Sequence, residues 1–187
     1  YLLKKKEIIF LHIPKNAGTT FKSMYPELKN RNHANSFPND DEINIAIIRN
    51  PITRFQSIFN HIKNRSQIKK NSNDLLDINS LDELAKAYYD INNANHNKIR
   101  NLLSWNKNKI YSYKNNKKNN GGCPINKKNI GCIHWAPQYL FIDNGDKIDY
   151  LLKFENLEND LKKLQRLDVL KKNKILFKNK SKESHKQ

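Results

Sequence analysis

A short loop that contains a lysine is the first stretch of this sequence with residues that could do chemistry. It reads PKNAGTT over residues 14–20, between an apolar run and a segment of helical character. Backbone N–H groups at a helix start, a glycine that permits close approach and two hydroxyl donors together suit a phosphate or a sulfate. Lys15 adds a full positive charge, so the loop predicts an oxyanion site.

The position of Lys15 argues against a nucleoside-triphosphate site. The P-loop pattern is Gly-x-x-x-x-Gly-Lys-Ser/Thr, with its lysine after the last glycine, whereas Lys15 precedes Gly18. A carboxylate for Mg²⁺ would be expected after the next apolar run, and the chain carries Arg49 there. Because an arginine suits a second phosphate and not a metal, we expect no metal site.

Arg49 and Ser57 form a second candidate anion site. Arg49 ends a predicted strand, and Ser57 follows eight residues later on a predicted helix. Ligands of α/β sheets bind at the carboxyl ends of strands, and a guanidinium and a hydroxyl can share one phosphate. An arginine in an ion pair and a serine on a solvated face would explain either residue alone. Beside the first loop, an anion site is the better interpretation.

Alternating strands and helices must position these residues. Continuous apolar, β-branched runs predict buried strands, and helices follow them with one apolar face each. We predict strands at 7–13, 43–49 and 147–155, and helices at 19–25, 52–63, from Ser80 onward, and 156–167. Ser80 and Glu83 form a capping box at one of these starts. The alternation predicts an α/β fold with a parallel sheet.

Length and composition bound the organisation. A chain of 187 residues predicts a single domain over residues 1–187, with a long polar insertion at about 106–131. The formal net charge of +17 suits anionic partners of any kind, although a codon bias toward Asn and Lys would explain it equally well. Cys123 and Cys132 bracket a short loop, and both a disulfide and two free thiols stay open.

The compartment also stays open. No apolar stretch approaches the ~20 residues of a membrane span, and no secretory signal is visible. Because the chain begins at Tyr1, an upstream anchor or signal that has been removed remains an alternative. With such an anchor the protein would belong to the Golgi lumen, and without one to the cytoplasm. We expect a membrane anchor only in residues that this sequence does not contain.

The stretches HIPKNAGTT and RNPITRFQS together resemble the sulfotransferases that use 3′-phosphoadenosine 5′-phosphosulfate (PAPS). The resemblance is to the Golgi-type and bacterial carbohydrate sulfotransferases (sulfotransferase family 2-like), and it includes HWAPQYLFI at 134–142 and IDYLLKFENLENDL at 148–161. It implies a P-loop-NTPase-like three-layer fold with a central parallel sheet flanked by helices. Relatives usually continue past KNKSKE, so the resemblance implies a truncated cofactor-covering segment here, to which Asn179 and Ser181 would belong.

The resemblance also implies roles for matching residues. Lys15 would contact the bridging oxygen of the transferring sulfuryl group, and Arg49 and Ser57 would hold the 3′-phosphate. The 5′-phosphate would lie among Lys15, Asn16, Ala17, Gly18, Thr19 and Thr20. The product would be 3′,5′-bisphosphoadenosine, whose charges fixed donors can hold without a metal.

Two further side chains near the loop have open roles. Relatives usually carry Thr at the position of Asn16, and we expect the Asn16 amide to serve as a substitute donor to the anion. Glu155, at the end of the third predicted strand, would orient Lys15 or another loop residue, or serve a structural role.

A hydroxyl acceptor needs a general base. His33, in RNHANSF, resembles the histidine of an "HA[ST]" motif in bacterial relatives, and an imidazole suits proton removal at neutral pH. His134 is the alternative base, although we expect it to shape the acceptor pocket with Trp135 and Gln138. His12 is expected to be structural.

These features favour an enzyme that transfers a sulfuryl group from PAPS to a hydroxyl by in-line displacement, with a glycan as the expected acceptor. One alternative is a non-catalytic basic module that binds anions or nucleic acid. The sequence contains no recognisable nucleic-acid motif, so we expect no nucleic-acid partner. A P-loop nucleotide kinase is the other alternative, and the position of Lys15 argues against it.

Overall fold

A parallel sheet of four strands in the order β2-β1-β3-β4 forms the centre of the fold. The computed structural model of the protein describes residues 6–32, 40–68, 78–105, 133–142 and 147–174. The strands are β1 (Glu7–His12), β2 (Lys29–Asn32), β3 (Glu42–Ile48) and β4 (Tyr150–Lys153). In the register of the central strands, Phe10 lies opposite Ile45, and Ile47 lies opposite Leu152.

The structure confirms the predicted α/β class and three of the strands. The apolar runs at 7–13 and 43–49 become β1 and β3, each shifted by at most one residue. The third strand is shorter than the predicted 147–155, because the chain turns into the short 3₁₀ helix η2 (Phe154–Asn156). The edge strand β2 reads KNRN and was not predicted, since it has no apolar pattern.

Helices follow three of the strands. They are α1 (Gly18–Met24), α2 (Pro51–Ile68), α3 (Leu81–Tyr89), α4 (His96–Leu103), α6 (Tyr139–Ile142) and α7 (Leu157–Arg166), with a 3₁₀ helix η1 (Ile133–Trp135) before α6. The Ser80 side chain caps α3 by accepting a hydrogen bond from the Glu83 N–H. None of the helices in the described part of the chain has the length and apolar character needed to span a bilayer.

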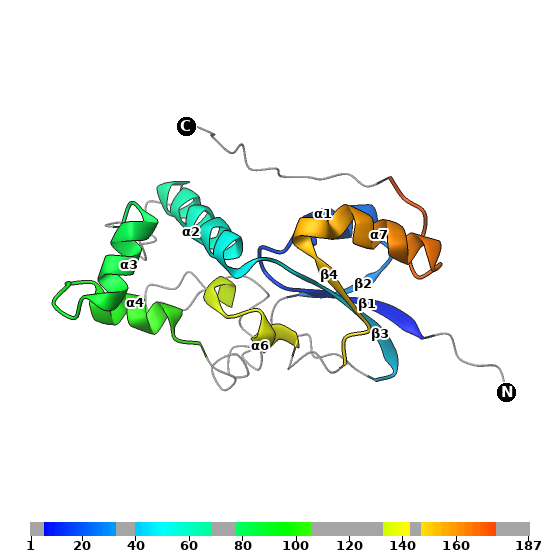
Figure 1. The fold of residues 1–187 in the computed structure, drawn as a ribbon, viewed down its shortest axis with the longest axis horizontal. Helices are drawn as coiled ribbons and strands as arrows, with labels where there is room; N and C mark the ends of the chain where they lie inside the picture. Colours follow the sequence, from blue (N-terminus) through cyan, green and yellow to red (C-terminus); the bar gives the residue numbers. More distant parts are fainter. Residues whose placement is uncertain (1–5, 33–39, 69–77, 106–132, 143–146, 175–187) are drawn as a thin grey trace.

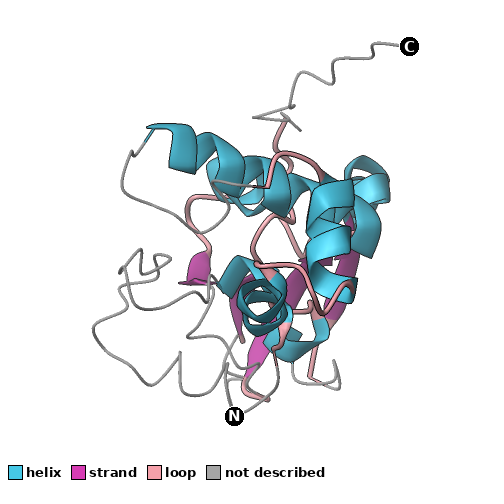
Figure 2. Ribbon diagram, turned by 90° about the vertical axis from the view of Figure 1, so that its left-hand side faces the viewer, coloured by secondary structure: helices cyan, strands magenta, loops and turns pink. Residues whose placement is uncertain are grey.

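Two hydrophobic clusters cover the two faces of the sheet. Side chains alternate along a strand, so Ile9 and Leu11 belong to one cluster while Phe10 belongs to the other. Helices α1 and α7 complete the second cluster and lie over the strands in Figure 1. Against the strand residues of the first cluster pack side chains from α2, α3, α4, η1 and α6. Figure 2 views the molecule from the side of α3 and α4, with the strands partly hidden behind helices.

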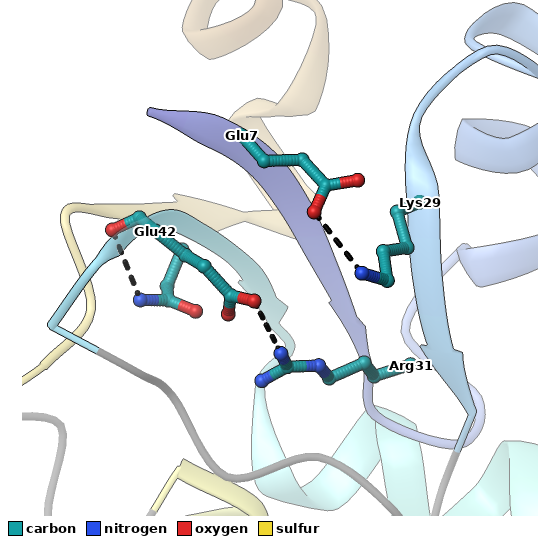
Figure 3. A network of polar contacts seen from close by, with 5 residues as sticks. Glu7, Lys29, Arg31 and Glu42 are labelled. Carbon is teal, nitrogen blue, oxygen red and sulfur yellow. Dashed lines mark hydrogen bonds and ion pairs between the residues drawn. The ribbon is translucent and has the colours of Figure 1, made fainter. Parts of the chain in front are cut away.

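Ion pairs connect the edge strand β2 to its neighbour β1 and, across β1, to β3. Figure 3 shows Lys29 on β2 paired with Glu7 on β1, at 3.0 Å between Nζ and Oε2, and Arg31 paired with Glu42 on β3. The first pair is exposed and contributes little to stability. The second is largely shielded from solvent, so it holds a polar strand to the sheet that apolar contacts alone would not.

Several expectations lie outside the described residues. They concern His33 as the base, the insertion at about 106–131, the pairing of Cys123 with Cys132, and the segment with Asn179 and Ser181. A single domain with this insertion therefore stays a prediction.

Candidate active site

The loop between β1 and α1 has an unusual backbone. Lys15 and Ala17 have φ values of 67° and 60°, in the left-handed region that costs a residue with a side chain about 1–3 kcal/mol. Asn16 stands between them without a positive φ. Turns in which the sign of φ alternates can direct successive N–H groups into one concavity, as anion sites require. The strained backbone therefore lies at the predicted oxyanion loop.

Gly18 begins α1 against a histidine ring. A Cβ atom added to Gly18 would lie 2.0 Å from His12 Cδ2 and from His12 Nε2, so no larger residue fits. The His12 ring also stacks on Phe10, with ring centroids 6.0 Å apart. His12 thus packs between strand and helix, as a structural role requires. Of the hydroxyl residues that follow, Thr19 is exposed and Thr20 is buried.

The Asn16 side chain points into the protein. It is fully buried, and its Nδ2 donates to Ile47 O at 2.7 Å and to Gln138 Oε1 at 2.6 Å. Both amide hydrogens are therefore engaged by protein acceptors. The expectation that this amide donates to the anion is wrong for this structure, because the end of β3 and Gln138 lie close enough to take both hydrogens. Asn16 can contribute to the cradle through its backbone.

The structure brings Arg49 to Lys15. Arg49 Nη1 donates to Lys15 O at 3.4 Å, and Arg49 Nε donates to Thr53 Oγ1 at 3.1 Å. The guanidinium also lies over the Phe154 ring, with Cζ 4.4 Å from the ring centroid, a cation–π arrangement. Three contacts from three segments thus orient the Arg49 side chain beside the lysine loop.

Two hydroxyl residues of α2, Thr53 and Ser57, lie on the side of the helix that carries the contact with Arg49. Thr53 accepts from Arg49 Nε, and Ser57 follows Thr53 by four residues, which places both on one side of the helix. Ser57 is half-buried. Thr53 was missed by the sequence analysis, although its spacing to Ser57 was a usable signal.

Arg54 is a buried cation that the sequence analysis also missed. Its side chain is 5% exposed; Nε donates to Pro14 O at 3.1 Å and Nη2 donates to His134 O at 3.0 Å. It therefore connects α2 both to the lysine loop and to η1. Its position four residues before the buried Ile58 could have indicated that it faces inward.

Like charges lie close together in this site. Burial and, secondarily, the Arg49 charge lower the pKa of Lys15 below its usual value. The same two causes, burial first, lower the pKa of Arg54 to about 10. Each shift means that a cation is disfavoured where it stands. An anion beside Lys15 and Arg49 would offset the repulsion between these like charges, so the cluster is suited to hold one.

Gln138 lies between the two candidate anion sites. Its Oε1 accepts from Arg49 N at 2.8 Å as well as from Asn16, and its Nε2 donates to Arg49 O at 2.7 Å. In this arrangement the carboxamide serves the protein backbone at Arg49.

His134 and Trp135 are buried beside α2. They are 9% and 5% exposed. The His134 ring meets the His61 ring edge-on at 5.4 Å between centroids, and the Trp135 ring lies 5.0 Å from that of Phe55. The carbonyl of His134, through Arg54, connects this segment to the lysine loop.

Glu155 has a structural partner at the β3–α2 turn. Its Oε1 accepts from Asn50 N at 2.7 Å, while Asn50 Oδ1 accepts from the N–H groups of Ile52 at 2.9 Å and Thr53 at 3.3 Å. Asn50 thus caps α2, as its residue type favours, and Glu155 holds the cap. Of the two roles left open for Glu155, these contacts support the structural one.

A groove runs past the start of α2. It has a volume of about 360 Å³ and is lined by Pro51, Ile52, Phe55, Gln56 and Leu81.

The described residues contain no group of three or more His, Cys, Asp or Glu side chains arranged to hold a metal ion.

Comparison with known proteins agrees with this chemistry at the level of the family. No curated protein and no solved structure matches the chain significantly. The model of one family, described as the Sulfotransferase family, matches residues 2–187. The match includes the lysine loop, the β3–α2 turn with Arg49, and the segment from η1 to α6. The chain therefore belongs to the Sulfotransferase family, whose general activity is sulfuryl transfer.

Proposed function

We propose that the protein transfers the sulfuryl group of PAPS to a hydroxyl of a carbohydrate acceptor by in-line displacement, with 3′,5′-bisphosphoadenosine as the product. The observation that supports this most strongly is the convergence of Lys15, Arg49 and Arg54 at one strained loop. Lys15 and Arg49 follow the carboxyl ends of β1 and β3, and Arg54 reaches the same loop from α2, so positive charges of a kind that binds phosphate and sulfate gather there.

The donor set fits a bisphosphorylated nucleotide. Near the 5′-phosphate we place Lys15 and the 16–20 backbone with the Thr19 and Thr20 hydroxyls. Arg49 and Ser57 would hold the 3′-phosphate, and Thr53, whose hydroxyl already accepts from Arg49 Nε, would orient that guanidinium. The lowered pKa of Lys15, caused by burial and then by Arg49, supports an anion as the natural neighbour of this pair.

When bound, PAPS supplies the sulfuryl group and a 5′-phosphate that leaves. Lys15 would stabilise the negative charge that develops on the leaving oxygen. Such stabilisation is effective when the donor is already fixed before the reaction. Arg54, through Pro14 O, and Arg49, through Lys15 O, hold the backbone on which Lys15 stands. The side chain therefore starts from a backbone that needs little rearrangement.

The general base is proposed to be His33, which would take the proton of the acceptor hydroxyl. His134 is the alternative; its ring is buried against that of His61. A His33→Ala variant with near-normal turnover would favour His134.

A thermal-shift experiment tests the proposal. Adenosine 3′,5′-bisphosphate at a hundredfold excess over its Kd should stabilise the protein by about 2.7 kcal/mol, while ATP at equal concentration should do little. An unchanged melting temperature at saturating bisphosphate would overturn the proposed function. Transfer from labelled PAPS to a panel of sugars, phenols and lipids would then identify the acceptor class.

A further inference from the structure

We propose that Gln138 is a positioning residue that fixes the backbone of Arg49 and the lysine loop relative to each other. This inference rests on the proposed function of the site, and it gives Gln138 a role on the donor side of the reaction. The residue precedes α6 in a segment that the sequence alone associates with the acceptor. Its three hydrogen bonds connect it to Arg49 and Asn16, which lie 89 and 122 residues away in the chain.

The Gln138 carboxamide pairs with the backbone of Arg49. Regular pairing between β1 and β3 ends at Leu11 opposite Ala46, and pairing between β3 and β4 ends at Ile48 opposite Lys153, so Arg49 lies beyond both ladders. The Gln138 carboxamide accepts from Arg49 N at 2.8 Å and donates to Arg49 O at 2.7 Å. It therefore acts as a substitute peptide group for Arg49, beyond the last paired residues of β3. Backbone groups away from water need such partners.

The Gln138 carboxamide also bonds to the lysine loop. The same Oε1 atom accepts from Asn16 Nδ2 at 2.6 Å, and that nitrogen also donates to Ile47 O at 2.7 Å. Asn16 stands between Lys15 and Ala17, the two loop residues with positive φ. Strained backbone persists only where surrounding contacts hold it. Gln138 thus contributes to the loop conformation as well as to the backbone of Arg49.

The chemistry of the side chain explains why a glutamine is needed. A carboxylate offers acceptors but no donor for Arg49 O, an asparagine is one methylene shorter, and an apolar residue offers neither group. With its backbone held by Gln138, its Nε by Thr53 and its guanidinium plane by Phe154, Arg49 is oriented before any ligand arrives. Preorganisation of this kind raises affinity because less freedom is lost on binding.

The experiment compares Gln138→Leu with a matched control, Gln165→Leu. Gln165 is also a buried glutamine, and its Nε2 donates to Tyr25 Oη at 2.8 Å and to Asn173 O at 3.0 Å, on the α1–α7 side of the sheet. The first readout is hydrogen exchange of the Arg49 backbone amide, followed by NMR without ligand. The second is the Kd of adenosine 3′,5′-bisphosphate, measured by calorimetry.

In Gln138→Leu, amide exchange at Arg49 should become about tenfold faster, and the Kd of the bisphosphate should rise about tenfold. Both are the effect of losing one or more ordinary hydrogen bonds. Gln165→Leu should lower the melting temperature and leave both readouts at wild-type values. Should Gln138→Leu fail to fold, the milder Gln138→Asn keeps the carboxamide but shortens its reach, and the same changes are expected from it.

Unchanged exchange at Arg49 in the Gln138 variants would overturn the inference, and so would equal changes in Gln165→Leu. Exchange is measured without ligand, so it decides the role of Gln138 separately from the proposed function. If the wild-type protein did not bind the bisphosphate, the proposed function would fail while the exchange comparison would still decide whether Gln138 holds Arg49.

Discussion

Lys15 carries its positive charge half-buried beside a second cation, and this arrangement has opposite consequences for stability and for function. Burial and the Arg49 charge lower the pKa of Lys15, so folding disfavours the charged ammonium relative to the neutral amine. The same ammonium is the group proposed to stabilise the leaving phosphate. Residues that act in this way commonly have perturbed pKa values.

Replacement of Lys15 by Met should therefore separate activity from stability. We expect kcat to fall by about 10²–10³-fold, the usual cost of losing one donor at a developing charge, while the melting temperature at neutral pH stays equal or rises. Transfer from labelled PAPS and thermal unfolding measure the two effects. A melting temperature well below that of the wild type would contradict the like-charge explanation.

The pKa shift of Lys15 also predicts how the stability difference between the wild type and Lys15→Met changes with pH. Because the pKa of Lys15 is lower in the folded state than the ordinary lysine value of 10.5, the unfolded chain binds more protons between the two values. Stability of the wild type then rises with pH in that window, relative to Lys15→Met. The advantage of the variant should shrink as the pH approaches 10.5, and a widening gap would contradict the assignment.

At the scale of elements, α2 does more than cover the sheet. Asn50 caps the helix, Arg49 immediately precedes this cap, and Arg54 faces inward from the first turn. Arg54 connects the helix to the loop after β1 and to η1 through two backbone carbonyls, at 3.1 Å and 3.0 Å. A helix that is held at both neighbouring segments can fix the distance between the two candidate anion sites.

Arg54→Met should loosen this connection. The variant leaves Pro14 O and His134 O without their donor, and an unsatisfied buried acceptor costs about 1–3 kcal/mol. Relief of the repulsion from Arg49 offsets part of this cost, so we expect a net loss of about 2 kcal/mol in the free energy of unfolding, measured in urea.

The matched control for Arg54→Met is Arg100→Met on α4, where the arginine is exposed. That substitution should change the free energy of unfolding by less than about 0.5 kcal/mol. Equal losses in both variants would show that the two carbonyl contacts of Arg54 contribute nothing specific.

At the scale of the whole molecule, the net charge of +17 surrounds the site with a field that attracts anions. Such fields raise association rates, and salt screens them over a Debye length of about 8 Å at physiological ionic strength. The field acts on any anionic ligand, so the orientation of the ligand must come from Lys15, Arg49 and the loop.

This distinction predicts a salt dependence. The association rate of adenosine 3′,5′-bisphosphate, measured by stopped flow, should fall steeply as NaCl rises from about 0.02 to 0.5 M. Adenosine 5′-phosphate carries less charge and should show a shallower slope. A rate that does not vary with salt would mean that the excess of Lys and Arg does not steer the ligand.

The sequence by itself determined the parts of this protein that depend on local pattern. Continuous apolar runs predicted β1 and β3, Ser80 and Glu83 predicted the start of α3, and the spacing within the lysine loop and from Arg49 to Ser57 predicted anion chemistry. The structure confirms the α/β class, and the family match confirms the resemblance to sulfotransferases. These features follow from residue type and spacing, which are readable along the chain.

Only the tertiary structure decided which partners these residues have. The polar strand β2 joins the sheet through pairing with β1 and through ion pairs, so no apolar pattern marks it. The amide of Asn16 turns inward because Ile47 O and Gln138 Oε1 lie within 2.7 Å. Arg54 becomes a buried connector because two carbonyls face it. A hydrogen bond requires partners brought together from distant segments, and that proximity is a property of the folded chain.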